Sequence, residues 1–415
     1  RLVGRRHLER RRQQAVTALG TDDRPGVEIE LRRCRFVAAH ANYPPIGQPL
    51  IDNDELALCL GRMPTGDALP VPIVRLPSGV LCVGPTGTAK TTLVMLLVYQ
   101  LMSLPAASVK PCIVVFDFKD TWRSIADWPG MAEQVVHLTA AELKLSLLQP
   151  PPKVDQHLWL NTITTLFAMA YRIMSAQRLL RDVLESLVAR SPSGFWPSLT
   201  VLIEQVADFR PGRGTREATY KESILNALKD LATQLPVFDH VRSDLPERLF
   251  ATPTLFIVDV GALSPDHLCF LGTYLLAWLF ARRRCDPASR DRFAQFIFED
   301  ATSIVGPQRS KDTPGGQSLL DQYSTITREM NIGLCVVAHQ FDQISPALAS
   351  NLENLIAFSP RRDDDRLLMR MMGVTAEQAR AMKQFPRGQA TAVIPSVWPS
   401  PVPIYFPSRP EVREP

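Results

Sequence analysis

One segment constrains the fold of this chain more than any other: residues 80–104. Residues 80–83 form a short apolar run, typical of a buried strand. The next residues, 84–91, read Gly-Pro-Thr-Gly-Thr-Ala-Lys-Thr, and residues 91–104 are mostly apolar and predict a helix. A strand, a glycine-containing loop ending in Lys-Thr, and a helix, in this order, match the Walker A pattern.

Phosphate binding accounts for the spacing of this loop. Gly84 and Gly87 let the backbone turn so that its N–H groups point at phosphate oxygens, and the helix N-terminus faces the same anion. We expect Lys90 to reach the β- and γ-phosphates and the Thr91 hydroxyl to coordinate Mg²⁺. The sequence therefore predicts a site for ATP and Mg²⁺, formed by Gly84, Pro85, Thr86, Gly87, Thr88, Ala89, Lys90, Thr91 and Thr92. Ala89 stands where the pattern has Gly, which costs free energy if this position needs a positive φ.

Three other apolar runs end in carboxylates, at Asp117, at Asp259 and at the pair Glu299–Asp300. Hydrolysis needs one carboxylate to hold the Mg²⁺ water shell and a second to orient or deprotonate the attacking water. Only the pair offers two adjacent acids, so we expect Glu299 to serve the metal and Asp300 to act on the water. Asp117 is a further candidate for nucleotide contact. The alternative interpretation is an ordinary strand end with two solvated acids.

The arrangement of apolar runs predicts an α/β fold. Nearly continuous hydrophobicity, without alternation, indicates a mostly parallel sheet covered on both faces. The predicted strands are residues 80–83, 112–116, 254–258, 296–298 and 333–338, and the predicted helices between them are 91–104, 267–284 and about 318–329. Residues 155–235 instead show helical periodicity, so we expect an all-helical insertion between the second and third strands. Gln340 follows the last strand and is expected to contact the γ-phosphate or its water, or else simply to cap the strand.

The order of these motifs resembles the HerA/FtsK superfamily. The matching segments lie within about residues 45–410 and read GPTGTAKTT, VVFDFKD, LFIVDVGALS, FIFEDA, TREMNIGLCVVAHQ and FPRGQATAVIP. Within the superfamily the chain is most similar to the type IV coupling proteins of conjugation and secretion and to the HerA helicases. The resemblance implies a RecA-like (ASCE) P-loop core, a homo-hexameric ring and ATP-driven, sequence-independent translocation of DNA. Its trans-acting arginine matches Arg328, with Arg361 and Arg362 as the next candidates and a surface ion pair as the alternative.

Three functions stay open at this stage. The first is a coupling ATPase of conjugation or type IV secretion, which would act with relaxosome or secretion-channel proteins. The second is a soluble HerA-like motor of DNA processing or phage defence. The third is a nucleotide-binding assembly protein with little hydrolysis, which the residues Ala89 and Asp300 motivate. DNA contacts are expected in two basic loops, residues 210–216 and 306–316, at Arg213, Arg309 and Lys311.

Charge and composition set the remaining expectations. The 415 residues carry a net charge of +4, but the first twelve hold six Arg and one Glu, a local charge of +5, which leaves about −1 for the rest. We expect this basic segment to lie beside anionic lipid or a membrane span preceding Arg1, which places the protein in the cytoplasm at the inner face of the membrane. The seven cysteines lack metal-site spacing and are expected to be buried thiols in a reducing compartment.

Proline clusters suggest the boundaries of the regions. We expect a basic N-terminal segment at 1–44, the first part of the ATPase core at 45–153, the helical insertion at 154–250, and the second part of the core with a C-terminal strand and tail at 251–415.

Overall fold

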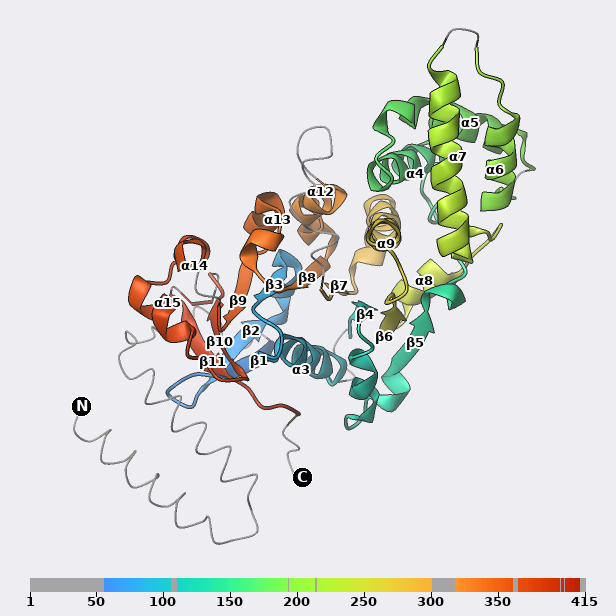
Figure 1. Ribbon diagram of the computed structural model, residues 1–415. Coiled ribbons are helices and arrows are strands. Elements are labelled where there is room, and N and C mark those ends of the chain that lie inside the picture. The colour runs from blue at the N-terminus through green and yellow to red at the C-terminus, as the bar shows by residue number, and fades with distance from the viewer. Residues whose placement is uncertain are drawn as a thin grey trace, which may run out of the picture. The chain divides into compact units, whose positions relative to one another are not determined.

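A computed structural model describes residues 56–105, 110–192, 194–212, 215–300, 318–360, 365–395, 397–398 and 400–410 (Figure 1). The chain divides into two compact units. Unit 1 comprises Arg1–Ile73, Val83–Leu93 and Asn354–Pro415, and unit 2 comprises Val74–Cys82 and Val94–Glu353.

Unit 2 contains the predicted parallel sheet. Its strands are β3 (Val80–Val83), β4 (Cys112–Asp117), β5 (Val135–Thr139), β6 (Leu255–Asp259), β7 (Ala294–Phe298) and β8 (Ile332–Ala338), in the spatial order β3-β8-β7-β4-β6-β5. Strands β8, β7, β4, β6 and β5 pair in parallel, each with the next. Asp117 lies opposite Asp259 and Phe116 opposite Phe298, so the carboxyl ends of these strands meet at one edge of the sheet.

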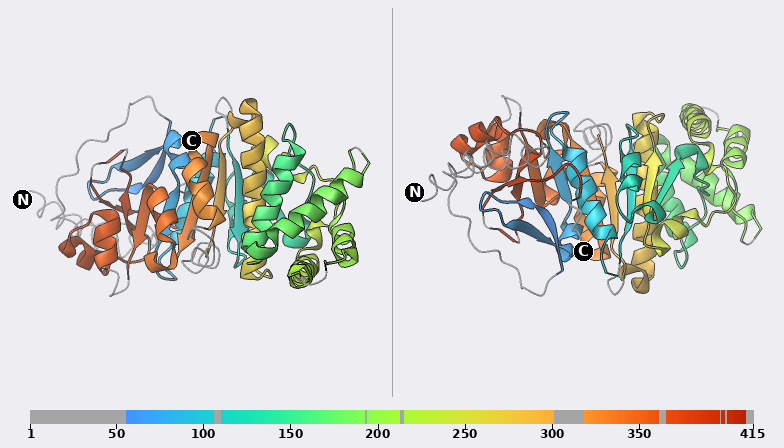
Figure 2. Two further views of the ribbon diagram at one scale, coloured as in Figure 1. Left: turned by 90° about the horizontal axis from the view of Figure 1, so that it is seen from above. Right: turned by 90° about the horizontal axis from the view of Figure 1, so that it is seen from below.

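Burial explains why these strands could be predicted. Every residue of β4, β7 and β8 is buried, as expected for strands covered on both faces. Helix α9 (Pro265–Cys285) lies in front of the strands in the left view of Figure 2, and α3 (Lys90–Met102) lies in front of them in the right view. Strand β5 was missed because it is an edge strand with no buried residue. The helical insertion follows β5 and precedes β6, so it lies between the two predicted strands 112–116 and 254–258, as expected.

The insertion is helical, as predicted. Its helices are α4 (Gln156–Ala170), α5 (Gln177–Arg190), α6 (Leu199–Asp208), α7 (Glu217–Gln234) and α8 (Leu245–Ala251). Side-chain caps begin two of them: Asp155 accepts a hydrogen bond from Leu158 N, and Ser198 accepts one from Val201 N. Helix α4 packs against α5 and α9, and α6 packs against α7 (Figure 1). The Trp159 ring of α4 packs edge to face on the Tyr274 ring of α9, with centroids 5.8 Å apart, which contributes to the contact between the insertion and α9.

The helices α12 (Leu319–Ile326) and α13 (Pro346–Asn351) complete the described helices of unit 2.

Unit 1 is built differently. Its strands are β1 (Ala57–Arg62), β2 (Ala68–Pro72), β9 (Asn354–Phe358), β10 (Gln389–Val393) and β11 (Val402–Tyr405), in the order β2-β1-β11-β10-β9. All of these pair antiparallel, and the helices α14 (Asp365–Met372) and α15 (Ala376–Met382) connect β9 to β10. The parallel sheet was therefore predicted from apolar runs, whereas most of these antiparallel strands were not.

Two further features of the described chain are its lack of membrane-spanning helices and the burial of its cysteines. In the part of the chain that the structure describes, no helix has both the length and the hydrophobicity that crossing a membrane requires. Of the six described cysteines, four are buried, whereas Cys59 and Cys285 are exposed, so burial was wrongly expected for these two. Burial raises the pKa of the Cys112 thiol to about 11, which keeps it protonated and unreactive at neutral pH.

Candidate functional site

The phosphate-binding loop lies in unit 1, between Val83 at the end of β3 and Lys90 at the start of α3. Two of its residues have left-handed backbones: Gly87 with φ +86° and Ala89 with φ +77°. A Cβ on Gly87 would meet no heavy atom within 4 Å, so the backbone angle, and not crowding, favours glycine there. Ala89 does adopt the positive φ that its departure from the pattern put in question. The left-handed conformation costs a non-glycine residue roughly 1–2 kcal/mol.

Gly84 is required for a different reason. A Cβ at this position would lie 2.6 Å from the Cβ of Phe358, in β9. That distance is shorter than real Cβ contacts, so a side chain at residue 84 would push the loop away from β9. The first glycine of the motif thus allows close packing of the loop within unit 1.

The Lys90 ammonium is held inside the loop. Lys90 is only 7% exposed, and its Nζ donates to Gly84 O at 2.6 Å and to Pro85 O at 3.0 Å. The Thr88 hydroxyl also donates to Pro85 O, at 2.8 Å. A buried ammonium, the N-terminus of α3 and the half-buried Thr91 hydroxyl together form a donor set that fits a nucleotide polyphosphate with Mg²⁺.

A turn that is distant in the sequence, at Gly388, donates a hydrogen bond to the phosphate-binding loop. Gly388, from the late Arg-Gly-Gln segment, has φ +83°, and its N–H donates to Thr88 O at 3.4 Å. Its carbonyl accepts from Phe406 N at 3.0 Å. The sequence marked this segment as a family feature but did not indicate that it contacts the phosphate-binding loop.

The two acids lie in unit 2, directly after β7. Glu299 is 6% exposed, and its Oε2 accepts from Trp122 Nε1 at 2.7 Å and from Thr121 Oγ1 at 3.2 Å. Asp300 has φ +49°; its Oδ1 lies 2.8 Å from His339 Nε2, and its Oδ2 forms an ion pair with Lys119 Nζ. These are not two solvated acids, because four side chains from two other strand ends contact them.

Residues 117–122, the last residue of β4 and the five that follow it, provide most of those contacts, and we call this segment the β4 loop. Asp117 is 1% exposed and accepts from Lys119 N at 3.1 Å, from Trp122 N at 2.9 Å and from Thr121 Oγ1 at 3.4 Å. These bonds give Asp117 a clear role in shaping the loop, and its predicted contact with nucleotide stays a prediction. Lys119, Thr121, Trp122 and His339 were missed as site residues. The available signal was only their position after the carboxyl ends of parallel strands.

The negative charge of Glu299 also affects a buried cysteine, Cys335. Hydrogen bonding with Cys82, burial and the negative charge of Glu299 all raise the pKa of the Cys335 thiol. Because its pKa is raised, the Cys335 thiol stays protonated and neutral. It lies in β8, which pairs with β7, the strand that precedes the two acids.

The other predicted residues are placed as follows. Asp259, the third strand-end carboxylate, accepts from Gly261 N at 3.0 Å and shapes its own turn. Gln340 is half-buried and follows His339 at the end of β8. Arg328 begins the short 3-10 helix η9 (Arg328–Met330), and its Nη1 lies 2.8 Å from Glu353 Oε1, with about half of each side chain exposed. In this chain alone, Arg328 therefore forms a surface ion pair.

A buried arginine anchors the turn that carries Arg328. The Nη1 of Arg283, at the end of α9, donates to Met330 O at 2.7 Å and to Asn331 O at 2.8 Å. Burial lowers the pKa of Arg283 to about 10, so it remains charged at neutral pH. The start of β8 is thus tied to α9.

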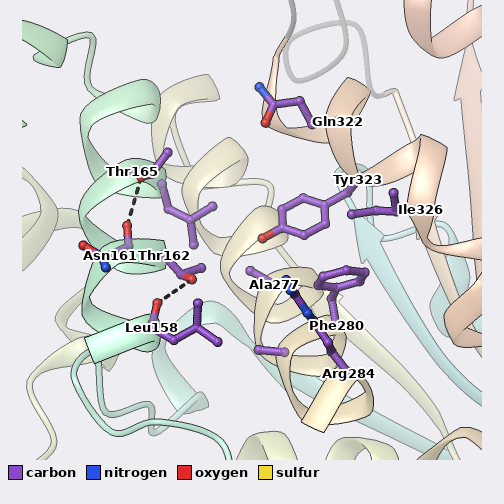
Figure 3. Close-up of a pocket in the computed structure, with 12 residues that line it drawn as sticks. Leu158, Asn161, Thr162, Thr165, Ala277, Phe280, Arg284, Gln322, Tyr323 and Ile326 are labelled. Carbon is purple, nitrogen blue, oxygen red and sulfur yellow. Dashed lines mark hydrogen bonds between the residues drawn. The ribbon is translucent and has the colours of Figure 1, made fainter. Parts of the chain in front are cut away.

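A groove of about 320 Å³ lies between α4, α9 and α12 in unit 2. Figure 3 shows Tyr323 and Ile326 of α12 on one side and Leu158 and Thr162 of α4 on the other, with helix α9 between them and its Phe280 beside Tyr323. The Phe280 and Tyr323 rings meet edge to face, with centroids 5.5 Å apart. Helix α12, which precedes Arg328, thereby packs on the helix that also supports the insertion.

Several predicted residues lie outside the described part of the chain. They are the DNA candidates Arg213, Arg309 and Lys311, the alternative arginines Arg361 and Arg362, and the basic segment 1–44.

Comparison with known proteins gives a fold but no sequence family. No protein-family model matches the chain, and no curated protein matches its sequence. Among solved structures, VirB4 of Thermoanaerobacter pseudethanolicus superposes with a TM-score of 0.64 at 16% identity, over 87% of this chain and 98% of that one. The coupling protein TrwB in complex with ADPNP superposes with a TM-score of 0.61 at 14% identity, over 88% of this chain and 92% of that one. TrwB in complex with ADP and Mg²⁺ superposes with a TM-score of 0.60 at 13% identity, over 87% of this chain and 90% of that one. The chain therefore shares the fold of VirB4 and TrwB, and the predicted RecA-like α/β fold is confirmed.

Proposed function

We propose that this chain is an ATP-hydrolysing motor that translocates DNA, as a coupling ATPase of conjugation or type IV secretion. The observation that carries the proposal is the buried Lys90 ammonium, which the loop carbonyls of Gly84 and Pro85 hold directly at the N-terminus of α3. An ammonium buried at a helix N-terminus concentrates positive charge where a polyphosphate binds. The fold shared with VirB4 and TrwB supports the choice among P-loop proteins.

The residues divide the chemistry between them. In the proposal, Lys90 and the loop N–H groups bind the phosphates, and Thr91 and Glu299 hold Mg²⁺, directly and through water. Mg²⁺, when bound, neutralises charge on the phosphates. Asp300 orients the attacking water and takes its proton, with Lys119 and His339 holding the carboxylate in place. Gln340, next to His339, reports the state of the γ-phosphate to the end of β8.

Hydrolysis is the first test. Replacing Lys90 by Ala removes the buried charge, and we expect phosphate release from ATP to fall to background. Lys229→Ala, which removes an exposed lysine from α7, is the matched control and should keep the parental rate. A Lys90→Ala protein that hydrolysed ATP as fast as the parent would refute the site.

Arg328 tests the oligomer. Its exposed ion pair with Glu353 is of a kind worth at most about 1 kcal/mol, so a neighbour's nucleotide can compete for the guanidinium. We expect Arg328→Ala to bind nucleotide without hydrolysing it. Mixing it with Lys90→Ala should restore part of the activity, because one subunit then supplies an intact loop and the other an intact arginine. Arg181→Ala, which breaks another exposed ion pair, is the control. A mixture as inactive as either variant would argue against action in trans.

DNA is the proposed substrate of the motor, contacted without regard to sequence by Arg213, Arg309 and Lys311. DNA of unrelated sequences should stimulate hydrolysis equally, and the stimulation should fall steeply as salt is raised. Secretion-channel or relaxosome proteins are the proposed protein partners. The left-handed Ala89 favours one second candidate, a nucleotide-binding assembly protein with little turnover. A parental protein that binds ATP but shows no DNA-stimulated turnover would support that candidate.

A further inference from the structure

We infer that Trp122 is a positioning residue for Glu299, and that its indole N–H sets the direction in which this carboxylate faces Mg²⁺. The inference rests on the proposed function, in which Glu299 holds the metal's water shell. It adds a residue that neither the motifs nor the fold assigns to the site.

The first support is the contact itself. Trp122 is fully buried, and its Nε1 donates to Glu299 Oε2 at 2.7 Å. Thr121 Oγ1 lies 3.2 Å from the same oxygen and 3.4 Å from Asp117 Oδ1, so its single proton is shared between the two carboxylates. The indole N–H is the undivided donor to this oxygen, so it orients the carboxylate and stabilises a negative charge that burial would otherwise penalise.

The second support is the way in which the indole is held. Trp122 N donates to Asp117 Oδ2 at 2.9 Å, and Asp117 is the last residue of β4. In the sheet, β4 lies beside β7, with Phe116 opposite Phe298. Asp117 and Glu299 each directly follow one residue of this pair, so they lie on adjacent strand ends, and the short β4 loop connects them. A rigid, buried ring at the end of that bridge leaves the carboxylate little freedom to rotate.

The functional consequence concerns the metal and not the nucleotide. Loss of the indole N–H leaves the phosphate-binding loop unchanged, since that loop makes its own contacts within unit 1. The Glu299 carboxylate then has one fewer donor and a less defined direction. The expected result is a weaker hold on Mg²⁺ and slower hydrolysis, with ATP binding preserved.

The experiment compares two tryptophan substitutions in the full chain. Trp122→Phe keeps an aromatic ring and removes the N–H. Trp128→Phe is the control, because Trp128 is also buried and instead meets the Tyr99 ring edge to face, at 5.7 Å between centroids. We expect Trp122→Phe to lower kcat about ten-fold or more, the size expected for loss of a hydrogen bond to a charged group, and to raise the half-saturating Mg²⁺ concentration. Its KM for ATP should stay near the parental value, and Trp128→Phe should leave all three quantities unchanged.

A second substitution separates the hydrogen bond from packing. Benzothienylalanine at position 122 has almost the shape of tryptophan and carries sulfur in place of the N–H, so it tests the donor even where phenylalanine unfolds the protein. It should reproduce the fall in kcat and the raised Mg²⁺ requirement, with the parental unfolding temperature. Parental kcat and parental Mg²⁺ dependence in this variant would overturn the inference.

Glu299→Gln distinguishes failure of the inference from failure of the proposed function. If Glu299→Gln abolishes hydrolysis and the benzothienyl variant is parental, Trp122 has no positioning role. If Glu299→Gln itself hydrolyses ATP normally, the role proposed for Glu299 is wrong, and the inference falls with it.

Discussion

The phosphate-binding loop and the acidic residues after β7 are built in opposite ways. The side-chain bonds within the loop connect residues three to six positions apart: Thr88 to Pro85, and Lys90 to Pro85 and Gly84. The bonds to Glu299 span 177 and 178 positions, from Trp122 and Thr121. The loop is therefore largely shaped by its own local sequence, whereas the acidic residues depend on which strands lie side by side in the sheet.

This difference explains why the loop has a recognisable sequence motif and the surroundings of the acidic residues do not. A local turn must place glycine, lysine and threonine at fixed positions, and so it produces a recognisable motif. Contacts between strand ends have no fixed spacing along the chain, because insertions between strands change it freely. Substitutions that disturb one region and spare the other therefore test whether the two regions are independent.

The largest effect is expected in the acidic region. Asp300→Asn removes the group proposed to accept the proton of the attacking water, so kcat should fall about 10²–10⁴-fold, while nucleotide binding measured without hydrolysis stays unchanged. Asp259→Asn is the matched control, since Asp259 also ends a strand of the same sheet but bonds only Gly261 N among the contacts the structure describes. Equal losses in both variants would mean that strand-end carboxylates act on folding and not on the chemistry.

The same contrast explains what could be predicted. The motif predicted the loop as a unit, and the need of hydrolysis for two carboxylates, met by adjacent acids after an apolar run, predicted that Glu299 and Asp300 belong to a site. The same argument did not identify Trp122 or His339, because a tryptophan or histidine after an apolar strand is usually an ordinary packing residue. Among the missed strands, β5 has no buried residue and so produces no apolar run. Arg328 could be proposed only from a family resemblance, and its partner Glu353 has no signal in the sequence.

A smaller effect is expected from crowding the loop. Gly84→Ala places a Cβ 2.6 Å from the Phe358 Cβ, which we expect to cost roughly 1–3 kcal/mol and to weaken ATP binding by displacing the loop. Gly87→Ala is the comparison, because its Cβ meets no atom within 4 Å and only its φ of +86° is unfavourable. Thermal unfolding and ATP affinity measured on both variants test this. A larger loss for Gly87→Ala than for Gly84→Ala would show that contact with β9 is not what holds the loop.

The smallest effect, and the one of opposite sign, is expected at Ala89. Glycine relieves the cost of a Cβ at φ +77° but makes the unfolded chain more flexible, so Ala89→Gly should stabilise the protein by about 0.5–1 kcal/mol. Ala207→Gly, at an exposed position of helix α6, should instead destabilise by about 1 kcal/mol, because glycine disfavours a helix. The unfolding temperatures of the two variants should therefore move in opposite directions, with hydrolysis retained in both. If Ala89→Gly lowered the unfolding temperature as Ala207→Gly does, residue 89 would not hold a left-handed backbone in solution, and the local backbone turn that distinguishes the loop from the acidic region would not form as described.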